Sequence, residues 1–330
     1  MGRPRYAAAV TALWAMLAGG AQAAPPLALE RTLPLPHVAG RIDHLAFDPR
    51  HGHLLVAERD NGSLDVLDAA TGRATGRIAA LSAPQGVAYA PAADAIVVAN
   101  GGDGSVRFFR ADTLAPLGQI RLGADADDIA SGPDGSLAVG YGDGALALID
   151  PAARRVTATV ALPAHPEAFR IDTAAGRAFV NLPDAGRIDL ADLRTGRILA
   201  AWRTPGLRDN FPMALLAPGG ALAIGFRAPA RVALLDAADG HILAQAPACA
   251  DTDDLFADPR RGLLYLSCGA GAVDVLRHDG NTLAPLARIP TAPGARTALF
   301  VPALDRLFVA APAAADGTRQ AAILVLRPAP

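Results

Sequence analysis

A short turn, usually centred on proline, recurs about every forty residues along this chain. Aligning the segments FDPRHG, YAPAAD, SGPDGS, IDTAAG, LAPGGA, ADPRRG and FVPALD defines a turn column at Pro49, Pro91, Pro133, Thr173, Pro218, Pro259 and Pro302. Successive members of this column are 42, 42, 40, 45, 41 and 43 residues apart. A steady period of this length is the signature of a repeat architecture, in which each unit packs against its neighbours.

Each repeat contains four short apolar runs separated by turns rich in Gly, Pro or Asp. In the second repeat these runs are GVAY, AIVVAN, SVRFF and LGQIRL. They have the length of ordinary β-strands, and no later stretch keeps a helical period of 3.6 residues for long. Four strands in about forty residues are typical of a propeller blade, whereas solenoids of similar period use helices or one strand per repeat. The sequence therefore predicts an all-β fold, a seven-bladed β-propeller of four-stranded blades.

The last repeat indicates how the ring closes. It ends after the runs Leu307 to Ala310 and Ala322 to Leu326, without a fourth strand, while the strand-like run 27–35 precedes the first repeat. We expect this N-terminal strand to complete the seventh blade, because closure covers sheet edges that would otherwise pair with other chains. Residues 24–330 are then a single propeller domain. Its predicted blades are approximately 40–81, 82–123, 124–163, 164–206, 207–250, 251–292 and 293–328.

Residues 1–23 are predicted to be a secretory signal peptide. Arg3 and Arg5 precede an apolar stretch from Ala7 to Leu17, and the small-residue pattern Ala21-Gln22-Ala23 follows. This stretch is too short to span a bilayer comfortably, and the chain has no later run of about 20 apolar residues. We therefore expect a periplasmic or secreted protein without a membrane span.

Composition limits the partners of such a propeller. The chain has 52% hydrophobic but only 5% aromatic residues, which suits many small-residue strands stacked face to face. Its 30 basic residues are all arginines, and 32 acids give a formal charge of −2. Without a net positive field or a basic run, nucleic-acid binding has little electrostatic support. We expect a monomer whose partner is a small molecule or a protein.

The strings IVVANGGDGSVRFF and GVAYAPAADAI, repeated loosely through all seven units, resemble the YVTN-type repeat of the YncE-like seven-bladed propellers of bacteria. The resemblance extends over essentially the whole chain after residue 23. It implies an exported propeller, and it transfers the fold far better than the activity because the roles within that family are diverse. The WD and kelch dipeptide signatures are absent from the sequence, and the small number of Trp argues against the quinone-dependent dehydrogenase propellers.

The repeat alignment also predicts which side chains gather at one end of the ring. The loop before the innermost strand and the loop after the second strand lie at the same end of a blade, because these strands are antiparallel. Residues six and eight positions before the turn column, and those at the ends of second strands, should therefore surround one mouth of the central channel. The ligand-binding residues predicted at this mouth are Arg41, Asp43, His44, Gln85, Asn100, Tyr141, Asn210, Arg227 and Arg296.

Carboxylates are concentrated at the same positions, namely at Asp43, Asp125, Asp127, Asp128, Glu167, Asp251, Asp253 and Asp254. They would repel one another unless offset by Arg41, Arg296, protonation or a bound cation. Calcium or magnesium would suit these oxygen ligands, and a transition metal could also use His44 and His165. The candidate metal ligands are Asp125, Asp127, His165, Glu167, Asp251 and Asp253. Alternatively, most of these acids form turns or are solvated, because Asp bonds its own backbone where strands begin.

The chain has no G-x-S-x-G, H-E-x-x-H or C-x-x-C motif, so no catalytic machinery is apparent from motifs. We therefore expect a noncatalytic propeller that binds a small ligand, a metal ion or a protein partner at its polar mouth. One alternative is a metal-dependent hydrolase or lyase, similar in kind to the lactonase and streptogramin-lyase propellers, with His165 or Glu167 as general base. The other is a scaffold for protein assembly.

Cys249 and Cys268 are predicted to lie at this same mouth. An exported location permits a disulfide between them, but the sequence does not show whether their Cα atoms are within the about 7 Å that a bridge requires. Both the bridged and the free forms therefore remain open at this point.

Overall fold

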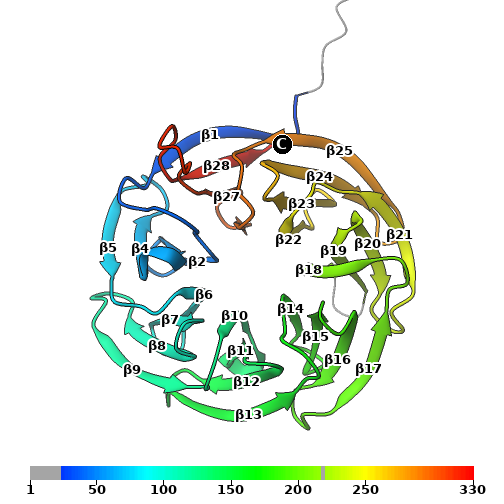
Figure 1. The fold of residues 1–330 in the computed structure, drawn as a ribbon, viewed down its shortest axis with the longest axis horizontal. Helices are drawn as coiled ribbons and strands as arrows, with labels where there is room; N and C mark the ends of the chain where they lie inside the picture. The colour runs from blue at the N-terminus through cyan, green and yellow to red at the C-terminus, as the bar shows by residue number, and fades with distance from the viewer. Residues whose placement is uncertain (1–23, 217–219) are drawn as a thin grey trace, which may run out of the picture.

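The repeats form a ring of seven antiparallel sheets around one axis (Figure 1). This computed structural model describes residues 24–216 and 220–330, so the predicted signal peptide and Pro218 lie outside the described residues. Every sheet has four strands, which confirms the seven-bladed β-propeller predicted from the repeat. The helical elements of the described ranges are two short 3-10 turns, η1 (Arg59–Asn61) and η2 (Pro133–Gly135). None of these described segments includes a helix long and apolar enough to cross a membrane.

Each blade runs in sequence order from the channel to the rim. Blades 1 and 2 consist of β2 (Leu45–Asp48), β3 (His53–Glu58), β4 (Ser63–Asp68) and β5 (Ala74–Ile78), then β6 (Pro84–Ala90), β7 (Ala95–Asn100), β8 (Ser105–Arg110) and β9 (Pro116–Arg121). Blades 3 and 4 consist of β10 (Ala126–Ser131), β11 (Leu137–Tyr141), β12 (Ala145–Asp150) and β13 (Arg155–Ala161), then β14 (Phe169–Asp172), β15 (Arg177–Leu182), β16 (Arg187–Asp192) and β17 (Ile198–Arg203).

Blades 5 and 6 follow the same order, and blade 7 differs only in its outer strand. Blades 5 and 6 consist of β18 (Arg208–Leu215), β19 (Ala221–Ala228), β20 (Ala230–Asp236) and β21 (Ile242–Pro247), then β22 (Thr252–Asp258), β23 (Leu263–Cys268), β24 (Ala272–His278) and β25 (Leu283–Pro290). Blade 7 consists of β26 (Ala298–Val301), β27 (Arg306–Ala311), β28 (Ala322–Pro328) and the N-terminal strand β1 (Leu27–Pro34).

Strand β1 closes the ring as the sequence predicts. It pairs antiparallel with β28, from Leu27 opposite Pro328 to Pro34 opposite Ala322, and Figure 1 shows the two strands side by side. A bulge between Leu29 and Arg31 reverses which face of the strand is buried. As a result, Leu27 packs between blades 6 and 7, whereas Leu33 packs between blades 7 and 1. Strands β1 and β28 thus belong to one blade, and each face of that blade is packed against a neighbouring blade.

The hydrophobic core is divided into seven clusters, one between each pair of neighbouring blades. Second strands such as β7 and β23 are buried along their whole length, because a neighbouring blade covers each face. This explains why these strands read as continuous apolar runs and not as alternating ones. The blades thereby hold seven innermost strands around a common channel, where the candidate site lies.

Candidate functional site

In blades 3 and 6 the innermost strand begins with an irregularity that turns neighbouring side chains toward the channel. In blade 3 the register of β10 with β11 shifts between Ala126 and Ile129, so Asp127 and Asp128 both fall outside the regular pairing. In blade 6 the shift between Thr252 and Asp254 leaves Asp253 as the extra residue. A bulge bends its strand and re-aims the side chains within it. Neighbouring acids such as Asp127 and Asp128 can therefore both line the channel, whereas on a regular strand their side chains would point to opposite faces of the sheet.

Charged side chains from four blades line a small cavity at the mouth of the channel, here called the mouth cavity. Its volume is about 30 Å³, which is enough for one water molecule or one ion. Its lining residues are Arg41, His44, Asp127, Asp128, Glu167, Ala168, Phe211 and Asp253. The repeat alignment predicted six of these eight to lie at the mouth, whereas Ala168 and Phe211 were not predicted.

A larger cavity of about 260 Å³, here called the channel chamber, adjoins the mouth cavity. The two cavities share His44, Asp128 and Ala168. Its remaining lining residues are Leu45, Val87, Ile129, Ala130, Arg170, Asp254, Phe256, Ala298 and Leu299. Six of the seven blades contribute to this wall, which is mostly apolar but carries four ionisable side chains.

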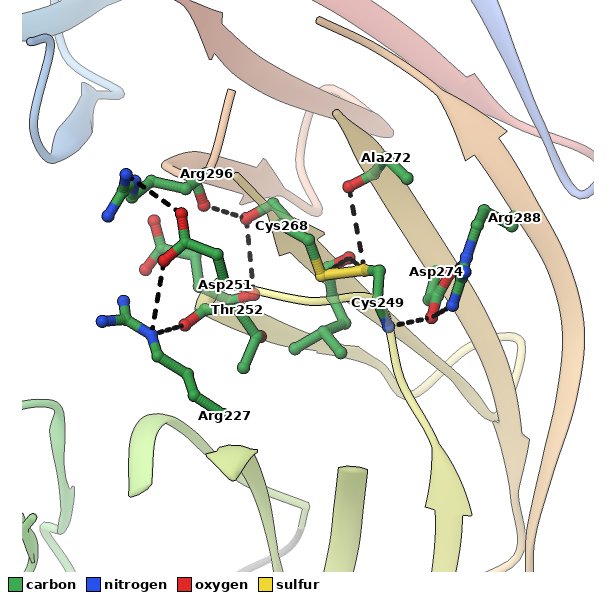
Figure 2. Close-up of a disulfide and its surroundings, with 12 residues drawn as sticks. Arg227, Cys249, Asp251, Thr252, Cys268, Ala272, Asp274, Arg288 and Arg296 are labelled. Carbon is green, nitrogen blue, oxygen red and sulfur yellow. Dashed lines mark hydrogen bonds and ion pairs between the residues drawn. A yellow bond between two sulfur atoms is a disulfide. The ribbon is translucent and has the colours of Figure 1, made fainter. Parts of the chain in front are cut away.

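Arginines from neighbouring blades offset the acids of blade 6 (Figure 2). The Arg227 guanidinium contacts Asp253. Its Nε also lies 3.6 Å from Asp251 Oδ1, a contact that Figure 2 shows. On the other side, Arg296 Nη2 lies 3.0 Å from Asp251 Oδ2. The Arg227 guanidinium also lies 3.5 Å from the centre of the Phe211 ring, within cation–π range. Pairing with Arg227 and Arg296 therefore explains how Asp251 and Asp253 can lie close together despite their like charges.

Two protonated histidines offset the acids of the other blades. Burial alone would lower the pKa of His44, but Asp254, Asp128 and further carboxylates raise it to about 10. Asp127, whose Oδ2 lies 3.6 Å from Nε2 of His165, raises the pKa of His165 to about 9. Both imidazoles are therefore charged at neutral pH, and a charged His165 cannot accept a proton as a general base.

Two carboxylic acids of the site titrate near neutral pH. Burial, together with the charge of the nearby Asp127, raises the pKa of Glu167 to about 7. Burial likewise raises the pKa of Asp254 to about 7, against the opposing charge of His44. A carboxyl group with a pKa near the working pH can take up or release a proton, so Glu167 retains the property that a general base requires.

Of the nine predicted ligand-binding residues, Arg41 and His44 line these cavities. The seven that do not are Asp43, Gln85, Asn100, Tyr141, Asn210, Arg227 and Arg296. Asn100 is buried, and its side chain bonds the backbone of residues 82, 98 and 105. Asn210 donates to Asn181 Oδ1, and the buried Gln85 of β6 bridges Arg59 and Asp125. Tyr141 ends β11 outside both linings. The side chains of Asn100 and Asn210 therefore form hydrogen bonds within a blade or to a neighbouring blade.

The turn-forming alternative applies to two of the candidate metal ligands. Asp125 and Asp251 have φ angles of 36° and 59°, a left-handed conformation that Asp adopts more readily than most residues. Across the described residues, one group offers three ligand atoms within 4.8 Å of one another, and it is Asp236, Asp239 and His241 on a turn at the rim. The carboxylates of the mouth that the structure describes are mostly paired with Arg and His, and no three of these residues offer ligand atoms within 4.8 Å of one another.

Arg170 is the principal channel residue that the alignment of polar positions missed. It lies three residues before the turn column, where the other six repeats have Ala46, Ala88, Ala130, Leu215, Phe256 and Leu299. Its Nη1 is 3.7 Å from Asp128 Oδ2 and donates to the Phe169 carbonyl at 2.7 Å. A single charge in an otherwise apolar column is a signal that the sequence does contain.

Cys249 and Cys268 are joined by a disulfide, with their Cα atoms 5.9 Å apart (Figure 2). The bridge ties the loop before β22 to the last residue of β23, and both residues are buried. The Cys249 N–H also donates to Asp274, which pairs with Arg288. The disulfide thus restrains the loop that carries Asp251 next to Arg227 and Arg296.

Comparison with known proteins supports the fold. No protein-family model and no curated protein matches the chain. A solved chain of hydrazine synthase from Kuenenia stuttgartiensis is similar with a TM-score of 0.75 and 18% identity, covering 89% of this chain and 98% of that one. A chain of the mitotic checkpoint complex (TM-score 0.77, 16% identity) covers 96% and 98%, and U3-55K (0.77, 14%) covers 91% and 98%. At such identities the likeness shows the propeller fold alone.

Proposed function

We propose that this chain is an exported, YncE-like propeller that binds a small ligand in its central channel, at the polar mouth, without catalysing a reaction. The propeller fold in general serves as a scaffold for binding ligands or proteins. The observation that carries the proposal is the mouth cavity itself, where charged side chains from blades 1, 3, 4 and 6 meet. These residues are distant in sequence, and the ring brings their charges to the same axis.

The electrostatics of the mouth support binding of a polar group. Its charges interact in a place with little access to water, where each contact is stronger than at the surface. Arg227, Arg296 and the two histidines already balance much of the negative charge. Because the mouth cavity holds about one water-sized group, we expect one hydroxyl or charged group of the ligand to enter it in exchange with an internal ion pair, while the rest of the ligand extends beyond the cavity.

The test is a calorimetric titration of the mature protein with calcium, magnesium and zinc chlorides and a panel of small polyols and organic anions. Asp253→Asn is expected to weaken binding of the ligand that the panel identifies, because it removes a charge from the mouth and the partner of Arg227. The control is Arg260→Gln, which changes an exposed ion pair with Asp305 at the opposite end of the ring. Equal losses from both variants would contradict the proposal.

One observation favours an enzyme as the second candidate. Glu167 lines the mouth cavity with a pKa of about 7, as a general base would. Of the two general bases considered for the hydrolase alternative, Glu167 remains, because His165 is protonated at neutral pH. A screen of lactones and esters, made with wild type and Glu167→Gln and accompanied by metal analysis, tests it. Turnover that is lost in Glu167→Gln would replace the noncatalytic proposal.

A further inference from the structure

We propose that the channel chamber binds a small carboxylic acid with an apolar body, and that Arg170 holds the carboxylate. The proposal rests on the proposed function in placing the ligand in the same channel. It adds the chemical class of the ligand and a second set of contacts, in the chamber and not at the mouth.

The Arg170 guanidinium has hydrogen-bond donors to spare. Among the described residues it makes one hydrogen bond, from Nη1 to the carbonyl of Phe169. Asp128 Oδ2, at 3.7 Å, is an ion-pair partner beyond hydrogen-bond distance. A guanidinium carries five N–H donors in a planar fork that matches the two oxygens of a carboxylate. Four of the five donors therefore have no hydrogen-bond partner among the described residues.

Asp254, one of the two acids that line the chamber, has partners other than Arg170. Its Oδ2 accepts the N–H of Ala298 at 2.8 Å, and its Oδ1 faces His44 Nδ1 at 3.9 Å. The other acid, Asp128, has Arg170 as its ion-pair partner, with Oδ2 3.7 Å from Nη1. The chamber therefore contains two acids and two cations, and a ligand carboxylate that bonds the Arg170 guanidinium does not have to displace a hydrogen bond from Asp128.

The walls of the chamber determine the rest of the ligand. Leu45, Val87, Ile129, Phe256 and Leu299 supply apolar surface from five blades. The volume of about 260 Å³ is just below the range of pockets that hold drug-sized ligands. A single aromatic ring or a short branched chain with one carboxylate fits this combination. A larger polyanion does not fit, because Asp128 and Asp254 also line the chamber and would repel further negative charge.

The experiment is a calorimetric titration of the mature protein with benzoate, phenylacetate and hexanoate. Benzyl alcohol and benzylamine serve as neutral and cationic counterparts. We expect at least one of the carboxylates to bind, and both counterparts to bind at least 10-fold more weakly. Arg170→Gln should weaken carboxylate binding by about 10- to 100-fold, as loss of charge-assisted hydrogen bonds does. Arg194→Gln removes the same charge from an exposed turn of the same blade and should leave binding unchanged.

Two further variants separate a local effect from a folding defect. Leu299→Trp fills the chamber from blade 7 without changing any charge, and it should abolish binding if the ligand lies there. Arg170→Lys keeps the charge but loses the fork, so binding should be intermediate. Undiminished carboxylate binding in folded Arg170→Gln or Leu299→Trp, binding of benzylamine as tight as that of benzoate, or no binding of any carboxylate would overturn the proposal. None of these results would affect binding that depends on Asp253 at the mouth, which tests the proposed function separately.

Discussion

Replacing Leu33 by alanine should destabilise the whole ring, because this side chain lies where the two ends of the chain are joined. Leu33 is 4% exposed and packs into the cluster between blades 7 and 1, against the turn at Gly72. A fully buried Leu→Ala change costs about 2 to 5 kcal/mol through lost burial and the cavity it leaves. At roughly 2 °C per kcal/mol for a domain of this size, the midpoint of thermal unfolding should fall by about 4 to 10 °C.

The matched control lies on the same strand. Leu29 is 57% exposed, so Leu29→Ala should change the free energy of unfolding by less than about 0.5 kcal/mol. Thermal unfolding followed by circular dichroism, and urea unfolding followed by the fluorescence of Trp202, measure both variants. Removal of residues 24–35 should have a larger effect than either, since it deletes the pairing of β1 with β28. An unchanged midpoint for Leu33→Ala, or equal shifts for the two variants, would refute ring closure by β1.

Three further predictions follow from the site. Thiol titration of the unfolded, unreduced protein should find no free thiol, and Cys249→Ser with Cys268→Ser should cost about 3 kcal/mol of stability; two free thiols would contradict the bridge. Because their folded pKa values are raised to about 10 and 9, His44 and His165 stabilise the fold fully below about pH 6.5, and this stability is lost as pH rises through 9 to 10. His44→Gln should flatten the decline measured by urea unfolding between pH 7 and 10, and an unchanged slope would count against a charged His44. Glu167→Gln should be more stable than wild type at pH 8, because the raised pKa of Glu167 means that its ionised form is disfavoured in the folded protein. A variant less stable than wild type would show that the carboxylate is needed for folding.

The fold could be predicted because the repeat imposes the same strand pattern seven times. In the second blade the runs AIVVAN and SVRFF correspond to β7 and β8 within one residue. The first strand, β6, begins at Pro84, two residues before the predicted run GVAY, because a register shift between Pro84 and Val87 interrupts the apolar pattern. Turn chemistry and apolar periodicity are local properties, so single-sequence reasoning recovers them.

The candidate site was predictable only in outline. The columns before the turn correctly brought Asp127, Glu167 and Asp253 to one cavity, because all repeats share one geometry. The partner of each charge is set by side-chain conformations across blade boundaries, such as Arg227 of blade 5 with Asp253 of blade 6, and the sequence does not encode these in a readable spacing. For the same reason, Asn100 has the right position in the repeat but turns its hydrogen bonds into its own blade.

Crystals of the mature protein, grown with calcium and with the small-ligand panel, give the most direct test of binding in the central channel. The account predicts difference electron density in the mouth cavity or the channel chamber, within contact of residues such as Asp127, Glu167 or Arg170. Density confined to the rim, such as the exposed turn of Asp236, Asp239 and His241, with a channel that holds only water at saturating ligand, would contradict it.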